Sequence, residues 1–192
     1  AVPMLVTGIV SIRASKRANL FNLNVRGGIA VVALGWILMS ALGALPFVIS
    51  GEIPNYIDAF FETASGFSTT GATILGDVEH LSKSILFWRS FTHWLGGMGV
   101  LVLTIALLPK LGIGAQRLMN AESTGPTKDK SSSTYLQTAR NLYKVYIGIS
   151  AAEVICLCLS GVNYFDALIH TFGTVGTGGL STFNKSIAAL GN

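Results

Sequence analysis

The feature that most constrains the fold is a run of 23 residues without a charged side chain, residues 28–50 (GIAVVALGWILMSALGALPFVIS). About 20 apolar residues suffice for a helix that crosses the hydrocarbon core of a bilayer. Two further apolar runs follow, residues 85–108 and residues 145–162. Only 11% of the chain is charged and 51% is hydrophobic, whereas about 25% of a soluble domain is charged. We therefore predict an all-α integral membrane protein with three spans and exclude the soluble classes.

The distribution of charge predicts the orientation of these spans. Ten of the thirteen Lys and Arg residues fall in two segments, 13–26 and 110–144. Basic segments beside membrane spans stay on the cytoplasmic side, so we predict that both are cytoplasmic. A nucleic-acid-binding arm is the competing interpretation, and it is disfavoured because both segments adjoin apolar spans. The polar segment 125–134 within the second is predicted to be a loop, as a solvated linker or a docking surface.

An internal repeat relates two segments at an offset of 108 residues without a gap: NYIDAFFETASGFSTTGATIL (55–75) and NYFDALIHTFGTVGTGGLSTF (163–183). Each copy begins with Asn-x-x-Asp, a pattern typical of a helix start. The helices predicted from it cover residues 56–67 and 164–175. Twelve residues rise only about 18 Å, too little to cross a core of about 30 Å. A short helix followed by a Gly/Thr turn is therefore predicted to re-enter the membrane beside a pore.

The turn after each short helix has the composition of a cation site. The two turns are Ser68-Thr69-Thr70-Gly71 and Gly176-Thr177-Gly178-Gly179. A dehydrated cation needs several oxygen ligands, and backbone carbonyls supply them where the chain is suitably bent. Glycine permits that backbone, and threonine adds a hydroxyl oxygen. The preceding helix presents its negative C-terminal end, which favours a cation over an anion.

In order along the chain, ALPFVISGEIPNYIDAFFETASGFSTTGATIL, FWRSFTHWLGGMGVLVLTIALLP, GPTKDK and ALIHTFGTVGTGGLSTF resemble the Trk/Ktr/HKT superfamily of potassium transporters, and most of all its bacterial TrkH branch. The resemblance implies four repeats, each a transmembrane helix, pore helix, filter loop and transmembrane helix. It also implies how this chain divides. Residues 1–27 would hold the end of a preceding helix and a linker, 28–110 the first repeat, 111–137 a cytoplasmic loop, and 138–192 a second repeat without its closing helix. We accordingly expect a fragment.

The same resemblance implies function and site residues. It implies potassium uptake across a bacterial cytoplasmic membrane, with Gly71 and Gly179 as filter glycines and the pore loops open to the outside. Oxygens of Thr69, Thr70, Thr177 and Gly178 would coordinate the ion, and no cofactor beyond transported potassium is expected. A literal Thr-Val-Gly at residues 174–176 lies three residues early in the repeat register, and we follow the register. The implied partners are a second copy, a cytosolic nucleotide-binding regulatory subunit and the lipid bilayer, but no nucleic acid.

Several alternatives stay open at this point. Glycine at position 71 favours potassium over sodium by resemblance, yet a sodium-permeable or sodium-coupled transporter fits the same residues. A non-conducting membrane binding or assembly module is the alternative from another class. Nothing indicates an enzyme. Glu62 and His170 occupy equivalent positions in the two short helices, where bonds to the backbone behind the turn are favoured over ion contact. Arg89 is equally compatible with a functional and an interfacial role.

Overall fold

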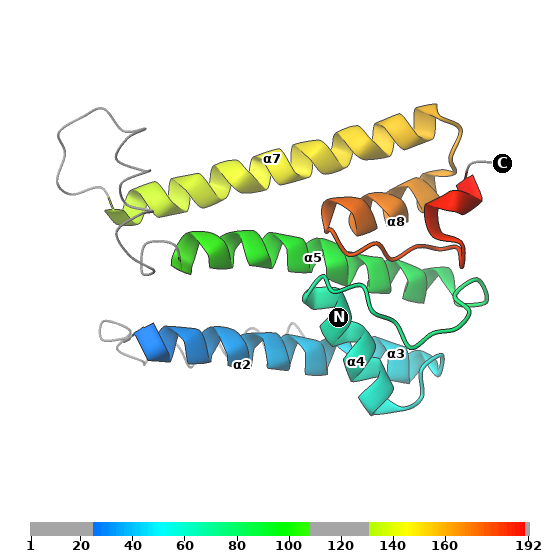
Figure 1. The fold of residues 1–192 in the computed structure, drawn as a ribbon, viewed down its shortest axis with the longest axis horizontal. Helices are drawn as coiled ribbons and strands as arrows, with labels where there is room; N and C mark the ends of the chain where they lie inside the picture. The colour runs from blue at the N-terminus through cyan, green and yellow to red at the C-terminus, as the bar shows by residue number, and fades with distance from the viewer. Residues whose placement is uncertain (1–24, 108–130, 191–192) are drawn as a thin grey trace.

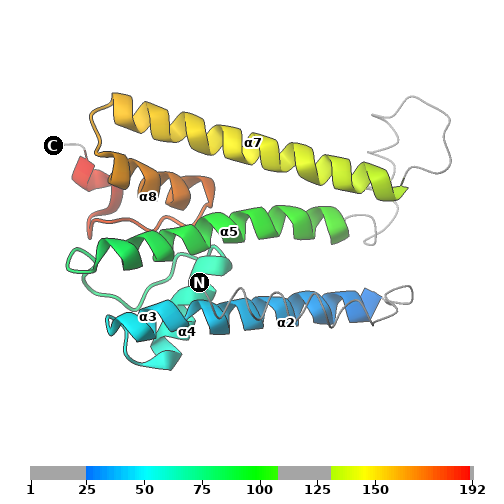
Figure 2. The same cartoon turned by 180° about the vertical axis from the view of Figure 1, so that it is seen from behind.

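The computed structural model describes residues 25–107 and 131–190, and every regular element in these two ranges is helical. Three long helices lie side by side, with α5 (Lys83–Leu107) between α2 (Val25–Gly43) and α7 (Ser131–Leu159) (Figure 1). The short helices α3 (Leu45–Ser50), α4 (Tyr56–Phe67) and α8 (Tyr164–Val175) gather at one end of this layer, and a 3-10 turn, η3 (Ser186–Leu190), ends the described chain (Figure 2). The predicted all-α class is confirmed over these residues.

The first predicted span is broken where the sequence suggested one continuous helix. α2 stops at Gly43 and α3 starts at Leu45, with a turn at Ala44. Pro46 stands in the first turn of α3, and proline has no N–H to donate to the carbonyl four residues earlier. Together the two helices still supply the apolar segment Ala30–Ser50, long enough to cross a membrane.

The second predicted span, α5, is an interior helix that contacts α3, α4, α7 and α8. It is long enough to cross a membrane. Among the described residues, however, only the segments Ala30–Ser50 and Gln137–Leu159 are also apolar enough to do so. The reason is a polar face on α5: Arg89, Ser90, Thr92 and His93 are all at most 2% exposed. Those side chains face protein, so α5 does not need the apolar surface that lipid demands of the outer helices.

The third predicted span begins earlier than its apolar residues do. Helix α7 starts at Ser131, inside the segment 125–134 that the sequence placed in a loop, and ends at Leu159 instead of 162. Apolar side chains on its exposed surface include Val145, Ile149 and Leu159, and α2 shows the same pattern at Val31 and Leu34. These outward faces are what a lipid-facing helix needs. The segments 1–24 and 108–130 lie outside the described residues.

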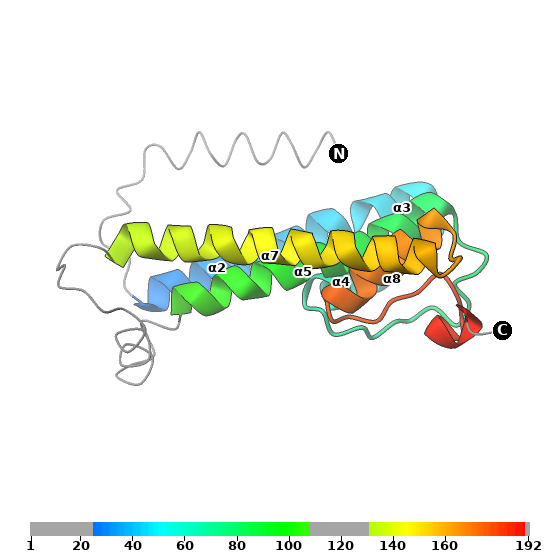
Figure 3. The same cartoon turned by 90° about the horizontal axis from the view of Figure 1, so that it is seen from above.

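Both predicted short helices are confirmed with their predicted bounds and caps. The Asn55 side chain accepts a hydrogen bond from the Ile57 N–H, and Asn163 accepts one from the Phe165 N–H, each at 3.0 Å. α4 packs against α2 and α5, whereas α8 packs against α5 and α7. Seen from above, α8 lies beneath α7, and the chain that follows it runs toward η3 (Figure 3). Helix α5 thus supports both copies of the repeat.

These caps give a first prediction. Asn55→Ala removes the side-chain acceptor that caps the start of α4, and we expect a loss of about 1 kcal/mol of stability. This loss of stability would be measured as a fall in the melting temperature of the detergent-solubilised protein. Asn55→Asp keeps an acceptor oxygen at the cap and serves as the matched control. Equal melting temperatures for Ala and Asp variants would contradict a capping role.

Candidate functional site

The two predicted turns have the same backbone conformation at the 108-residue offset. Thr69 and Thr177 have φ of 56° and 59°, and Gly71 and Gly179 have φ of 75° and 77°. The residue between the threonine and the glycine of each loop, Thr70 or Gly178, does not have a positive φ. A β-branched residue at positive φ is a true outlier, and strain of this kind clusters at ligand clamps and other functional sites. Finding it twice at equivalent positions shows that the repeat extends to the backbone.

The hydrogen bonds that end each short helix also repeat. The Thr70 N–H donates to the Ser65 carbonyl at 3.0 Å, and the Gly178 N–H donates to the Gly173 carbonyl at 2.9 Å. Thr174 and Val175 are the last two residues of α8, so the literal Thr-Val-Gly lies at the helix end. The loop starts with Gly176 in the second copy and with Ser68 in the first, as the repeat register predicts.

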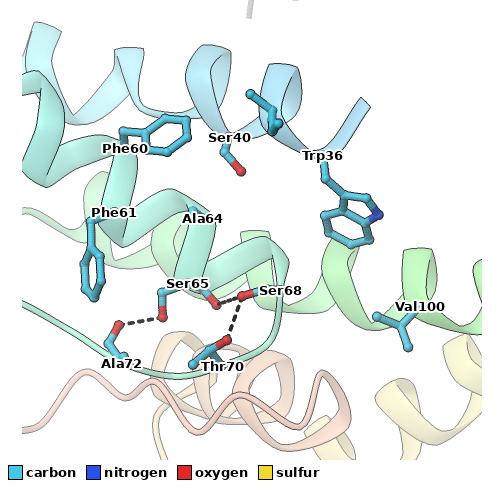
Figure 4. Close-up of a pocket in the computed structure, with 11 residues that line it drawn as sticks. Trp36, Ser40, Phe60, Phe61, Ala64, Ser65, Ser68, Thr70, Ala72 and Val100 are labelled. Carbon is cyan, nitrogen blue, oxygen red and sulfur yellow. Dashed lines mark hydrogen bonds between the residues drawn. The ribbon is translucent and has the colours of Figure 1, made fainter. Parts of the chain in front are cut away.

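Hydroxyl groups tie the first loop to the helix before it. The Ser65 hydroxyl donates to the Ala72 carbonyl at 2.6 Å, and the hydroxyl oxygens of Ser68 and Thr70 lie 2.7 Å apart. Ser68 and Thr70 border a cavity of about 600 Å³, whose other wall carries Trp36, Phe60 and Val100 (Figure 4). Ser68 and Thr70 therefore face the space beside α2.

The two loops meet at their glycines. A Cβ placed on Gly71 would collide with the carbonyl oxygen of Gly178, and one placed on Gly178 would collide with the His93 ring. By contrast, a Cβ on Gly179 would have nothing within 4 Å, so only its φ of +77° requires glycine. Close approach and backbone angle thus both demand glycine at position 71.

The loops separate two cavities. Thr69 and Thr177 line one of about 400 Å³ together with Val175 and residues of α5 and α7. Gly71 and Gly179 line another of about 200 Å³, with Arg89 and Asn184 in its wall. Each cavity contains the same position from both copies. Each loop therefore has its threonine beside one cavity and its final glycine, Gly71 or Gly179, beside the other.

Behind the first loop lies a buried ion pair. The Arg89 Nε lies 2.5 Å from Glu62 Oε1, and the side chains are 3% and 0% exposed. Glu62 also accepts hydrogen bonds from the Thr73 hydroxyl and the Ile74 N–H. Glu62 has the predicted structural role, with a bond to the Ile74 backbone behind the loop, and Arg89 is buried within the protein. One signal for this pair is present in the sequence, two opposite charges 27 residues apart in otherwise apolar segments, but sequence alone does not pair them.

Past the glycines, Asn184 connects the segments that follow the two copies of the repeat. Its side chain accepts from the Val78 N–H at 2.8 Å and donates to Asp77 Oδ1 at 2.7 Å, while its N–H donates to Glu79 at 3.1 Å. The hydrogen bond from Asn184 is the main cause that lowers the pKa of Asp77, followed by the Glu79 N–H. Asn184 carries no local signal in the sequence, because its partners lie more than 100 residues away along the chain.

The predicted site residues therefore differ in what surrounds them. Thr69, Thr177, Gly71 and Gly179 line the two cavities, while Ser68 and Thr70 face the third, beside α2. Gly178 lies between the Gly71 backbone and His93. Gly176 is buried at the C-cap of α8 against the His93 carbonyl, so it supports the loop from behind. Among the described residues no group of His, Cys, Asp or Glu has the arrangement of a metal site.

Glycines on the supporting helices allow this arrangement. A Cβ on Gly96 of α5 would strike the backbone carbonyl of Phe67, the last residue of α4, and one on Gly66 would strike the Thr92 hydroxyl. Helix α4 therefore lies in direct backbone contact with α5.

Paired re-entrant helices, each followed by a strained Thr/Gly loop and supported on a polar interior helix, define a class: membrane proteins built from helix–pore helix–loop repeats. Comparison with known proteins agrees. The family of TrkH, described as cation transport protein, matches residues 4–192. The chain therefore belongs to the TrkH family of cation transport proteins, which confirms the resemblance seen in the sequence.

Individual relatives place the chain within longer proteins. It is 41% identical over 174 residues to the Trk system potassium uptake protein TrkH of Vibrio parahaemolyticus, covering 89% of this chain and 36% of the relative. Identity to TrkH of Escherichia coli is 44% over 165 residues, or 84% and 34% of the two chains. The crystal structure of the Vibrio parahaemolyticus potassium transporter TrkH matches with a TM-score of 0.72 and 37% identity, covering 88% of this chain and 33% of that one. The chain spans about a third of these proteins.

The helix contact gives a second prediction. Gly96→Ala places a methyl group against the Phe67 backbone, which cannot rotate away, and overpacking of this kind costs about 1–3 kcal/mol. We expect a lower melting temperature and a lower yield of folded protein in the membrane. Gly148→Ala on α7 is the control, because its Cβ would meet nothing within 4 Å. An unchanged melting temperature for Gly96→Ala would contradict the backbone contact.

Proposed function

We propose that this segment forms part of a potassium-selective pathway through which the full-length protein takes up potassium across the cytoplasmic membrane. The observation that carries the proposal is the pair of equivalent strained loops that meet at Gly71 and Gly178. Alternating the sign of φ turns successive carbonyls toward one side, as a row of oxygen ligands for a dehydrated ion requires. The family's description as cation transport proteins supports the same conclusion.

The charges around the loops favour a cation. Helices α4 and α8 end at the loops, and Val175, the last residue of α8, lines the same cavity as Thr69 and Thr177. The C-terminal end of a helix carries a partial negative charge of about half an electron. Two such ends near one cavity favour a cation there, and the uncharged loops leave coordination to oxygen atoms.

On this proposal, oxygens of Thr69, Thr70, Thr177 and Gly178 coordinate potassium beside Gly71 and Gly179. The names of two relatives support potassium, since both are called potassium uptake proteins. Sodium permeation or sodium coupling through the same loops is the competing outcome, and it is measurable in the same assay. We further propose the orientation that the basic segments 13–26 and 110–144 predict, with these segments cytoplasmic and the cavity at Gly71 and Gly179 facing outward.

The implied assembly belongs to the proposal as well. The relatives are named as proteins of a Trk system, which supports a multi-component system. We propose a homodimer that binds a cytosolic nucleotide-binding regulatory subunit through the basic segment 110–144. Co-purification of such a subunit with the full-length protein, and its loss when the basic residues of this segment become neutral, would support the contact. Undiminished co-purification would reject it.

The filter assignment gives a third prediction. Gly71→Ser in the full-length protein adds a side chain at φ +75° and against the Gly178 carbonyl. Because this side chain forces the loop out of the geometry that presents its carbonyls, we expect the ratio of potassium to sodium uptake to fall by about tenfold or more, which corresponds to about 1.4 kcal/mol. Uptake of both ions in cells that lack other potassium transporters provides the measurement.

Two control variants sharpen this experiment. Gly179→Ser places a side chain at positive φ but against no neighbouring atom. Its selectivity for potassium over sodium should therefore fall less than that of Gly71→Ser. Gly35→Ser on α2 meets nothing within 4 Å and should behave as wild type. Unaltered selectivity in Gly71→Ser, with the protein present in the membrane, would reject the filter assignment.

A fourth prediction separates a pore from a non-conducting module. Cysteine placed at Thr177 borders the cavity that both loops share, so a small water-soluble thiol reagent should modify it in the full-length protein. Potassium should protect it if the ion binds there, whereas a large organic cation should not. A cysteine at Thr171, which is fully buried, is the matched control. Absence of labelling at position 177 would favour the module.

A further inference from the structure

The Glu62 carboxylate connects three separate parts of the first repeat. It lies on α4 and is paired with Arg89 of α5. On its other side, the Thr73 hydroxyl lies 2.9 and 3.0 Å from the two carboxylate oxygens, and the Ile74 N–H donates at 3.2 Å. Thr73 and Ile74 follow Gly71 within three residues. One buried carboxylate of α4 therefore fixes the segment that leaves the loop and binds α5 as well.

Arg89 brings a positive charge to the edge of a cavity that a cation would enter. It is 2% exposed, and it lines the cavity of about 200 Å³ that Gly71 and Gly179 also line. A lone guanidinium there would repel a cation strongly, because the surroundings screen charge weakly. The Glu62 carboxylate cancels most of that charge at contact distance. Arginine can thus hold the helix and the loop together without creating a barrier to cations.

The second repeat supports its loop differently. His170 occupies the position of Glu62, and Ser181 occupies that of Thr73 at the offset of 108. The Ser181 hydroxyl lies 3.4 Å from His170 Nε2, a long contact compared with those of Glu62. Within the described residues, neither His170 nor Ser181 has a salt bridge to an arginine or a lysine. Among the residues that the structure describes, a charged pair of this kind lies behind the first loop.

We infer that Glu62 and Arg89 form a charge-neutral brace that positions the loop 68–71 and keeps the cavity beside it open to cations. Both are positioning residues for selectivity, acting through Thr73 and through the local field. The inference rests on the proposed function. It differs from a purely structural ion pair in one respect: removing one charge or the other should have opposite effects on cation affinity.

The experiment compares four variants of the full-length protein in cells that depend on it for potassium. Glu62→Gln leaves the arginine charge unpaired, so the KM for external potassium should rise by about tenfold or more. Arg89→Gln leaves the carboxylate unpaired, so KM should stay the same or fall while selectivity over sodium declines. The double variant removes both charges and should recover most of the lost affinity. Thr73→Val keeps both charges but loses the hydroxyl, so selectivity should fall with little change in KM.

Glu52→Gln is the matched charge control. Glu52 accepts the Ser82 N–H at 3.1 and 3.3 Å and lines none of the cavities described above, so its loss should leave KM and selectivity unchanged. The amount of each protein in the membrane is measured by immunoblot, so that uptake is compared per molecule. If Glu62→Gln fails to reach the membrane, the selectivity of Thr73→Val becomes the test of the inference. Wild-type selectivity for potassium over sodium in Thr73→Val overturns the inference.

Two other results would overturn the inference. If Glu62→Gln and Arg89→Gln raised KM equally and the double variant were worse than either, the pair would serve stability alone. If the wild type and Glu52→Gln took up no potassium, the proposed function would fail and the inference with it. Potassium-selective wild-type uptake that none of the brace variants alters would overturn the brace while leaving the proposed function intact.

Discussion

The structure depends on one constraint: a backbone that turns inside a membrane must find its hydrogen-bond partners within the protein. Helices α4 and α8 have only twelve residues each, so the loops that follow them lie where lipid offers no partners. The described residues meet this constraint from behind the loops. Ser65 binds the Ala72 carbonyl, and Glu62 binds the Ile74 N–H. The polar face of α5 exists for the same reason, and it explains why the described part of α5 lacks the long apolar segment found at Ala30–Ser50 and Gln137–Leu159.

The repeat preserves backbone geometry more strictly than side-chain chemistry. Both copies share the asparagine cap, the helix length and the signs of φ at two loop positions. Behind the loops, however, one copy uses a carboxylate and the other an imidazole. Backbone angles are fixed by the need to present carbonyls, whereas several side chains can satisfy a buried backbone group. The two loops can therefore share a shape and still differ in stiffness and in the charge behind them.

Local signals in the sequence predicted the short helices, because a cap residue and its helix lie within one turn of each other. The repeat predicted the loops, since the offset aligned Gly71 with Gly179 across two otherwise different segments. Four features were beyond such signals. The break at Ala44 depends on Pro46 inside an apolar run, and the start of α7 at Ser131 lies in a segment whose composition is typical of a loop. The pairing of Glu62 with Arg89 and the contact of Gly71 with Gly178 depend on how helices sit in space.

The strained loops make sense as receptors formed before their ligand arrives. Thr69 and Thr177 hold positive φ although they are β-branched, and each such residue costs about 1–3 kcal/mol. Backbone bonds maintain this conformation: the Thr69 N–H donates to the Gly66 carbonyl and the Thr177 N–H to the Thr174 carbonyl. Folding thus supplies the ordering that an ion would otherwise have to induce, and pre-organised sites bind with less entropy loss. A loop this constrained also adapts poorly to an ion of another radius, which links its stiffness to the selectivity that we propose.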